Sequence, residues 1–444
     1  MDTIVGILTG NNSGVSIIRL SGQLSYSIAK DIFTNKIEDH KISYGHIKDK
    51  EIVDEVLLTY MAAPKSYTKE DVIEINCHGG IVNTNILLEL LIRKGARLAE
   101  PGEFSKRAFL NGRIDLAEAE AIMSLINSKT EKEHNIALKQ LRGQLSKEIE
   151  NYRSILLMLL AQIEASIDYP EHDMEHDNLA NVEKHMKEIL LAIEKLIEGR
   201  KEGKLIKEGI ETAIIGTPNV GKSSLLNKLV GEEIAIVTDI AGTTRDTVKE
   251  YINVKGIVLK IIDTAGIRNT NDVVEKIGVD KSLHLAKNCE LVIFILDNSK
   301  EATEEELNLF RAIESKKICI INKIDLNRKI DISKIEEITN NIIEISLKDN
   351  IGLDKFYCTI EEMFLAGFLE NENTNLIINN RHYESLIKAK ESLNQVLEGI
   401  ELSMTEDLLV IDIKDAYTHL GHITGASIDE DIIDKIFAEF CLGK

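Results

Sequence analysis

The residues best suited to do chemistry lie in one run near the middle of the chain, Gly216-Thr217-Pro218-Asn219-Val220-Gly221-Lys222-Ser223. The run fits the pattern G-x-x-x-x-G-K-[ST], in which glycines let successive backbone N–H groups turn inward around phosphate oxygens. Lys222 would reach the β- and γ-phosphates of a nucleotide, and the Ser223 hydroxyl would hold Mg²⁺. An apolar run, 213–215, precedes the loop and a helical pattern, 224–229, follows it, so a strand end and a helix N-terminus would shape the site.

Two further segments would complete the phosphate and metal end of such a site. The motif Asp263-Thr264-Ala265-Gly266 ends the apolar run 257–262, which would place a carboxylate near the metal and a glycine N–H near the γ-phosphate. The segment Gly242-Thr243-Thr244-Arg245-Asp246 lies between this motif and the phosphate loop, where a switch loop should present a hydroxyl to Mg²⁺. We expect Thr244 to be that ligand.

The base end of the site is predicted from two later motifs. Asn322-Lys323-Ile324-Asp325 ends the apolar run 318–321. The Asp325 carboxylate can accept hydrogen bonds from guanine N1–H and the 2-amino group, whereas adenine would leave it unpaired. Ser346-Leu347-Lys348 closes the next strand and would support the edge of the base. Together with the phosphate loop, these motifs predict a GTPase domain.

The residue after Gly266 indicates how such a GTPase would catalyse hydrolysis. Ile267 has no polar atom with which to orient the attacking water, the role that a glutamine fills in Ras-type enzymes. Another group must position the water, and another positive charge must replace an arginine finger. Asn219 offers a neutral oxygen to a monovalent cation beside the phosphates. Glu275 is a candidate for positioning the attacking water. The alternative interpretation is that Glu275 is an ordinary surface carboxylate on a helix.

The elements that must position these motifs alternate strand and helix, which predicts a mostly parallel α/β sheet of Ras-like type. The flanking segments carry apolar residues at three- and four-residue spacing, for example over 116–127, 130–164 and 179–199, and therefore predict a helical bundle. The chain is expected to be multidomain, with an α+β domain at residues 1–116, a helical domain at 117–207 and 363–444, and the α/β domain inserted at 208–362.

The composition of the chain indicates which binding partners and which cellular compartment to expect. The 444 residues are too many for one core, and the formal net charge of −21 argues against broad nucleic-acid coating by this chain alone. Five scattered cysteines predict a reduced, cytoplasmic protein. The start resembles no signal peptide, and no apolar run is long enough to span a membrane. The segment 169–177, rich in His, Asp and Glu, could bind a metal or be a solvated acidic loop.

The motifs resemble those of the MnmE/TrmE family of tRNA-modifying GTPases over nearly the whole chain. Within the predicted GTPase domain the resemblance rests on residues 216–225, 236–246 and 263–268. Related GTPases share those motifs but lack the flanking ones, which here are 67–71, 78–80, 101–105, 116–121 and the terminal Phe440-Cys441-Leu442-Gly443-Lys444.

The resemblance implies that K⁺ occupies the arginine-finger position. Its expected ligands are Asn219 and a loop at about 233–244, in which Thr238, Ile240 and Thr243 match contact positions. Glu275 matches the family's catalytic glutamate. Ser223 and Thr244 would bind Mg²⁺, and the expected GTP contacts are Asn219, Val220, Gly221, Lys222, Ser223, Ser224, Thr238, Asp239, Ile240, Ala241, Gly242, Thr243, Thr244, Asp263, Thr264, Ala265, Gly266, Asn322, Lys323, Asp325 and Ser346.

The resemblance also implies that the N-terminal domain dimerises and binds a one-carbon tetrahydrofolate, in its 5-formyl or 5,10-methylene form. Arg19, Glu74 and Arg113 match folate-contacting positions, and Lys444 matches the final lysine of the family. The family commonly carries lysine where this chain has Arg113, which keeps the charge but changes its geometry. Cys441 is a candidate nucleophile, with a partly buried, inert thiol as the alternative.

The function implied is a potassium-stimulated GTPase acting as a homodimer with the flavoprotein MnmG/GidA, which supplies FAD, in a heterotetramer-type complex. The pair would add a carboxymethylaminomethyl or aminomethyl group to C5 of the wobble uridine (position 34) of certain tRNAs. The alternative is a ribosome-assembly switch like Era or EngA, without modification chemistry. Such proteins usually carry a basic RNA-binding module, which this chain lacks.

Overall fold

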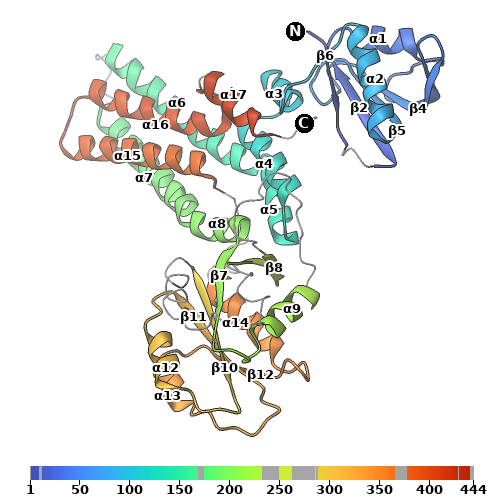
Figure 1. Cartoon of the computed structure of the whole chain (residues 1–444). Coiled ribbons are helices and arrows are strands. Elements are labelled where there is room, and N and C mark those ends of the chain that lie inside the picture. The colour runs from blue at the N-terminus through green and yellow to red at the C-terminus, as the bar shows by residue number, and fades with distance from the viewer. Residues whose placement is uncertain are drawn as a thin grey trace. The chain divides into compact units, whose positions relative to one another are not determined.

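The computed structural model describes residues 2–9, 13–168, 175–232, 250–262, 286, 289–365, 378–428 and 430–440, and Figure 1 shows the whole chain. The chain divides into two compact units. The first contains Met1–Met123, Gln140–Ile189 and Ser385–Lys444, and the second contains Ser124–Lys139 and Leu190–Glu384. None of the helices in the described parts is long and apolar enough to cross a membrane.

The N-terminal part of the first unit is a mixed sheet, and the helices Ser25–Ile32 and Ile81–Arg93 pack on one face of it. Its strands are ordered β3-β4-β5-β2-β1-β6, and every neighbouring pair is antiparallel except β1 with β6. The strands are β1 (Ile4–Ile7), β2 (Val15–Ser21), β3 (Ile42–Lys48), β4 (Ile52–Met61), β5 (Val72–His78) and β6 (Arg97–Leu98), and the helices are α1 (Ser25–Ile32), α2 (Ile81–Arg93) and α3 (Glu103–Leu110).

Alternation along the strands of this sheet separates a core face from a polar face. Ile18 and Leu20 of β2 and Ile73 and Ile75 of β5 are fully buried in one cluster with side chains of α1 and α2. Side chains in a strand point to opposite faces in turn, so Arg19 and Glu74 belong to the other face. The two are direct partners in the β2–β5 register, which places a cation beside a carboxylate.

The helical part of the first unit joins segments from both sides of the α/β region. Figure 1 shows α6 (Gln144–Asp168) beside α16 (Glu406–Thr424). Lys414 and Glu164 form an ion pair of 2.8 Å between them, and the Arg153 guanidinium lies 4.3 Å from the Tyr417 ring centre. The other helices of the described chain outside the α/β sheet region are α4 (Leu116–Asn127), α5 (Glu131–Leu141), α7 (Glu175–Glu198), α8 (Arg200–Glu208), α15 (Asn380–Glu401) and α17 (Glu430–Ala438).

The single helix predicted over 130–164 is wrong at one point. The chain turns between α5 and α6 at Gly143, whose φ of +78° is a left-handed conformation that suits glycine. A Cβ there would lie 2.8 Å from Oε1 of Glu118. Apolar spacing continues across this turn, so periodicity alone could not reveal it.

The second unit contains the predicted α/β sheet, with strands ordered β12-β11-β10-β7-β9-β8. All neighbouring pairs are parallel except β8 with β9. The strands are β7 (Ile210–Ile215), β8 (Glu250–Val254), β9 (Ile257–Ile261), β10 (Leu291–Asp297), β11 (Lys316–Asn322) and β12 (Ile342–Ile345), and the helices are α9 (Lys222–Glu232), α12 (Glu304–Arg311), α13 (Ser333–Glu336) and α14 (Leu353–Leu365).

Helices cover both faces of this sheet, as the near-continuous apolar strands predict. One buried cluster joins the strands to α9 and α14 and includes Ile136 of α5, and a second joins them to α12 and α13. The carboxyl ends of parallel strands meet at one edge, where doubly wound folds bind their ligands. The phosphate loop follows β7 at that edge, and Asn322 ends β11 there.

Candidate functional site

The phosphate loop connects the end of β7 to the first turn of α9, where the helix N-terminus favours negative charge. The Lys222 ammonium donates to the carbonyl oxygens of Gly216 and Thr217 at 2.7 and 2.9 Å. These bonds fold the lysine back across its own loop. The predicted phosphate ligand is therefore already placed at the mouth of the loop.

Two later carbonyls of the loop, those of Asn219 and Val220, are held by the base-recognition motif. The Asn322 side-chain amide donates to the Val220 carbonyl at 2.7 Å, and the Lys323 ammonium donates to the Asn219 carbonyl at 2.8 Å. In a planar trans peptide the C=O and the following N–H point in opposite directions. Holding these two carbonyls outward therefore turns the N–H groups of Val220 and Gly221 away from Asn322 and Lys323.

Gly221 is required where the two motifs touch. Its φ is +110°, and a Cβ at this position would lie 2.3 Å from the Asn322 side-chain nitrogen. Any larger residue would push apart the phosphate loop and the base-recognition motif. The glycine in the sequence pattern thus serves the close approach of the two segments as well as the turn.

At the base end, Asp325 is oriented by a buried neighbour. The Ser346 hydroxyl donates to Oδ1 of Asp325 at 3.0 Å, and Ser346 is fully buried. The Leu347 N–H lies 3.4 Å from Oδ1 of Asn322, which links the Ser346 segment to the same motif. The structure therefore brings together the phosphate loop, the Asn322–Asp325 motif and the Ser346–Lys348 segment.

Two residues of this site were missed from the sequence. Asp297 ends β10 with its side chain 4% exposed and forms an ion pair of 2.6 Å with Lys323. Burial opposes its ionisation, but hydrogen bonds from Lys323 and Ser299 prevail and lower the pKa of the carboxyl. Glu306 of α12 accepts a 2.7 Å bond from the Thr217 hydroxyl. An acidic residue ending an otherwise apolar strand was the available signal for Asp297.

Several predicted residues lie outside the described part of the chain. They are the switch and cation-loop positions Thr238, Asp239, Ile240, Ala241, Gly242, Thr243 and Thr244, the motif Asp263, Thr264, Ala265 and Gly266, the candidate catalytic Glu275, and the terminal Cys441 and Lys444. The candidate metal ligands of segment 169–177 also lie outside the residues whose side chains are described. Among the residues that can be searched, no group of His, Cys, Asp and Glu is arranged to hold a metal.

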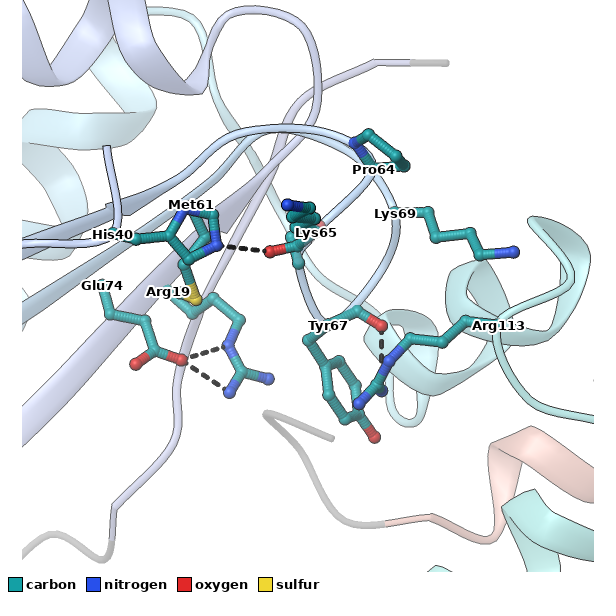
Figure 2. A pocket seen from close by; sticks show the side chains of 10 residues that line it. Arg19, His40, Met61, Pro64, Lys65, Tyr67, Lys69, Glu74 and Arg113 are labelled. Carbon is teal, nitrogen blue, oxygen red and sulfur yellow. Dashed lines mark hydrogen bonds and ion pairs between the residues drawn. The ribbon is translucent and has the colours of Figure 1, made fainter. Parts of the chain in front are cut away.

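A second candidate site is a cavity of about 530 Å³ on the polar face of the N-terminal sheet (Figure 2). Arg19 holds Glu74 through two contacts, of 2.9 Å from Nε and 2.7 Å from the second guanidinium nitrogen. Arg113 donates to the Tyr67 carbonyl at 3.1 Å. The guanidinium carbons of Arg19 and Arg113 lie 4.8 and 4.6 Å from the Tyr67 ring centre. Three residues predicted to bind folate thus line one cavity.

The charge of this cavity is mostly positive. Its lining contains four lysine or arginine side chains, one histidine and a single carboxylate. The full lining is Arg19, His40, Met61, Pro64, Lys65, Ser66, Tyr67, Lys69, Glu74 and Arg113. The turn between α3 and α4 carries Arg113 and is tied to the cavity wall by Lys69, whose ammonium donates to the Gly112 carbonyl at 2.8 Å. Such a cavity suits an anionic ligand that also offers N–H donors to Glu74.

Three of the four described cysteines are buried thiols. Cys77, Cys289 and Cys319 are buried, and burial raises the pKa of their thiols to about 11, 11 and 12. Cys358 is exposed on α14.

Comparison with known proteins places the chain in a family. The N-terminus of GTP-binding protein TrmE matches residues 3–113, and the MnmE helical domain matches residues 116–441. The tRNA modification GTPases MnmE of Enterococcus faecalis and Alkaliphilus oremlandii are each 47% identical to this chain. The alignments cover 100% of this chain and 98% and 99% of those proteins.

Among solved structures, the G domain of T. maritima FeoB is 26% identical over 34% of this chain and 97% of its own length. Its TM-score of 0.26 is too low to support an argument. The sequence matches alone establish the family. They decide against the alternative of a ribosome-assembly switch like Era or EngA. The chain belongs to the MnmE family of tRNA modification GTPases.

Proposed function

We propose that this GTPase is stimulated by K⁺ and that, with a flavoprotein partner of the MnmG/GidA type, it adds a carboxymethylaminomethyl or aminomethyl group to C5 of the wobble uridine of certain tRNAs. The observation that carries the proposal is the cationic N-terminal cavity with its single carboxylate, Glu74, held by Arg19. A GTPase that acted only as a switch would have no use for such a cavity.

The cavity fits a one-carbon tetrahydrofolate. A pterin offers N–H donors, which the Glu74 carboxylate can accept, and the carboxylates of the glutamate tail suit Arg113, Lys65 and Lys69. The folate supplies a one-carbon unit when bound. Within this chain, Glu74 and Arg19 would orient the pterin, and Tyr67 would line the pocket between the two guanidinium groups. Lys444 is proposed as a further contact.

The phosphate loop fits a monovalent cation beside Mg²⁺. Asn219 is exposed in the loop, and its φ of +65° is a left-handed conformation that asparagine tolerates better than most residues. Its side-chain oxygen is a neutral ligand of the kind that weakly hydrated cations accept. K⁺ supplies positive charge when bound. We assign Thr238, Ile240 and Thr243 as its other ligands, Ser223 and Thr244 to Mg²⁺, and Glu275 to positioning of the attacking water.

The polar face of the N-terminal sheet supports the proposed homodimer. Ile42, Tyr44 and Leu57 are exposed there, and the strand register places Ile42 in the row of Glu74 and Tyr44 in the row of Leu57. A partner copy covering these apolar side chains would bury them beside the folate cavity. We propose that GTP hydrolysis changes the contact between two GTPase domains and that this change reaches the folate site.

The decisive experiment measures the modified nucleoside. Deleting the gene should remove the carboxymethylaminomethyl or aminomethyl group from wobble uridine, as detected by mass spectrometry of digested tRNA. Restoring the wild-type chain should return the group, and restoring a Glu74→Gln chain should not, although its GTPase rate should stay near wild type. Intact modification in the deletion strain would rule out the proposed function.

The cation assignment has its own test. GTPase rates of the purified chain should be much higher in KCl than in NaCl at equal ionic strength, and Asn219→Ala should remove the difference. Glu275→Ala should lower kcat by about 10²–10⁴, the scale of a lost acid–base or water-positioning group. Equal rates in the two salts would contradict the K⁺ assignment without touching the folate proposal.

A further inference from the structure

Lys323 joins the phosphate loop to a residue outside every GTPase motif found in the sequence. Its ammonium lies 2.8 Å from the Asn219 carbonyl and 2.6 Å from Oδ2 of Asp297. Its own φ is +65°, a left-handed conformation that is costly for a lysine. Such strain persists only where surrounding contacts fix it, and the ion pair to Asp297 is the strongest of the contacts described for this side chain.

Asp297 is itself rigidly held. Oδ1 accepts hydrogen bonds from the Ser299 N–H at 2.9 Å and from the Ser299 hydroxyl at 2.7 Å, which leaves Oδ2 for Lys323. The Asp297 side chain is 4% exposed and the Lys323 side chain 32%, so water reaches the ion pair only from the side of the lysine. The carboxylate therefore holds the ammonium at one point, from which it reaches the Asn219 carbonyl.

The orientation of the Asn219–Val220 peptide depends on this contact. With the carbonyl drawn toward Lys323, the Val220 N–H points the opposite way. A phosphate loop binds through such N–H groups, and turning even one of them away would weaken phosphate binding. Without the carboxylate of Asp297, the lysine side chain would be free to leave the carbonyl for solvent.

We propose that Asp297 is a positioning residue for the phosphate loop: it holds Lys323 against the Asn219 carbonyl and so keeps the Val220 N–H available to the phosphates of GTP. The same contact fixes the backbone of Asn219, so it also sets the position of the side chain assigned to K⁺. The effect on the K⁺ ligand rests on the proposed function, whereas the effect on the Val220 N–H does not.

The test compares ligands with and without phosphates. Asp297→Asn keeps the shape of the side chain and removes its charge. We expect the affinity for GDP to fall about tenfold, the scale of one hydrogen bond to a charged group. Guanosine, measured by competition, should bind the variant as well as it binds the wild type. A general loss of structure would weaken both ligands together, and an equal fall for both would overturn the proposal.

A double-mutant cycle tests whether Asp297 acts through Lys323. In a Lys323→Met background, Asp297→Asn should change GDP affinity less than twofold, because the contact it supports has already gone. A full tenfold effect in that background would contradict the mechanism. Glu306→Gln is a matched control, because it alters a different contact to the loop, through the Thr217 hydroxyl, and its effect should add to that of Asp297→Asn.

Two further measurements keep the proposal testable if the main variant folds poorly. Ser299→Ala removes one of the two bonds that hold Asp297 and should weaken GDP binding two- to threefold, without changing guanosine binding. Unchanged GDP binding in a folded Ser299→Ala variant would count against the proposal. The K⁺ concentration for half-maximal GTPase should also rise in Asp297→Asn. If K⁺ has no effect on the wild type, only the cation assignment fails, and the GDP comparison still decides the role of Asp297.

Discussion

The two candidate sites of this chain differ in the groups that would contact the ligand. In the nucleotide site, side chains hold backbone: Lys222, Lys323 and Asn322 donate to loop carbonyls, and the ligand would meet N–H groups. In the N-terminal cavity, side chains face the ligand directly, as with Arg19, Glu74 and Arg113. A substitution that distorts the loop backbone should therefore remove several ligand contacts at once and lower the affinity strongly. A substitution in the N-terminal cavity should remove one contact and lower the affinity by the contribution of that contact alone.

The largest effect is expected from Gly221→Ala. The added methyl would lie 2.3 Å from the Asn322 side-chain nitrogen, at a φ of +110° that alanine rarely adopts. Asn322 cannot retreat without releasing the Val220 carbonyl. Strain and the lost bond together should lower GDP affinity about 100-fold or more, as measured with a fluorescent GDP analogue. Folate affinity should not change.

Gly14→Ala is the matched control for that variant. A Cβ at Gly14 would meet no atom within 4 Å, so neither ligand should be affected. Normal GDP binding by Gly221→Ala would show that the loop backbone can accommodate the methyl group. The nucleotide site would then not be more sensitive to a single substitution than the N-terminal cavity.

In the N-terminal cavity, Glu74→Gln should lower the affinity for 5-formyl-tetrahydrofolate about 30-fold. The variant loses a charged acceptor for the pterin and leaves Arg19, whose side chain is 13% exposed, without its carboxylate. Isothermal titration would measure the change, and GDP binding should stay the same. Glu55→Gln is the control, since Glu55 carries an exposed carboxylate bonded to Tyr44 and does not line the cavity. Equal effects of the two variants would indicate a general loss of charge.

The contrast between the sites also explains what the sequence could predict. The phosphate loop and the Asn322–Asp325 motif were found because their function depends on glycines and polar residues at fixed spacing within one segment. Their flanking strands were recognisable as apolar runs, and the parallel sheet followed from the alternation with helices. The family resemblance assigned Arg19 and Glu74 to one site, but it did not reveal their direct pairing, because the two residues are 55 positions apart and no local pattern shows the strand register.

The contacts between distant segments were not predictable in the same way. Asp297 touches Lys323 only because β10 and β11 are neighbours, and a lone aspartate has no spacing to reveal it. The bond from Thr217 to Glu306 spans 89 residues of sequence. The break at Gly143 was hidden by apolar periodicity that continues across it. Each of these depends on tertiary packing rather than on local pattern.

A third variant tests side-chain recognition inside the nucleotide site. Asp325→Asn replaces an acceptor with a group that offers both an acceptor and a donor, which suits the C2 oxygen of xanthine better than the 2-amino group of guanine. GTP affinity should fall about tenfold, and the preference should shift toward XTP. Ser346 can still donate to the Asn oxygen, so the fold should survive. A loss of both nucleotides would place Asp325 among the residues that shape the loop.

The smallest effect is expected from Arg113→Lys. The ammonium keeps the positive charge for the folate glutamate tail, but it loses the planar face that lies 4.6 Å from the Tyr67 ring centre and weakens the bond to the Tyr67 carbonyl. Folate affinity should fall only about threefold by titration, whereas Arg113→Met should cost about tenfold because the charge is lost as well. Equal losses in the two variants would mean that geometry, not charge, is what Arg113 contributes. The N-terminal cavity would then depend on a fixed shape, as the phosphate loop does.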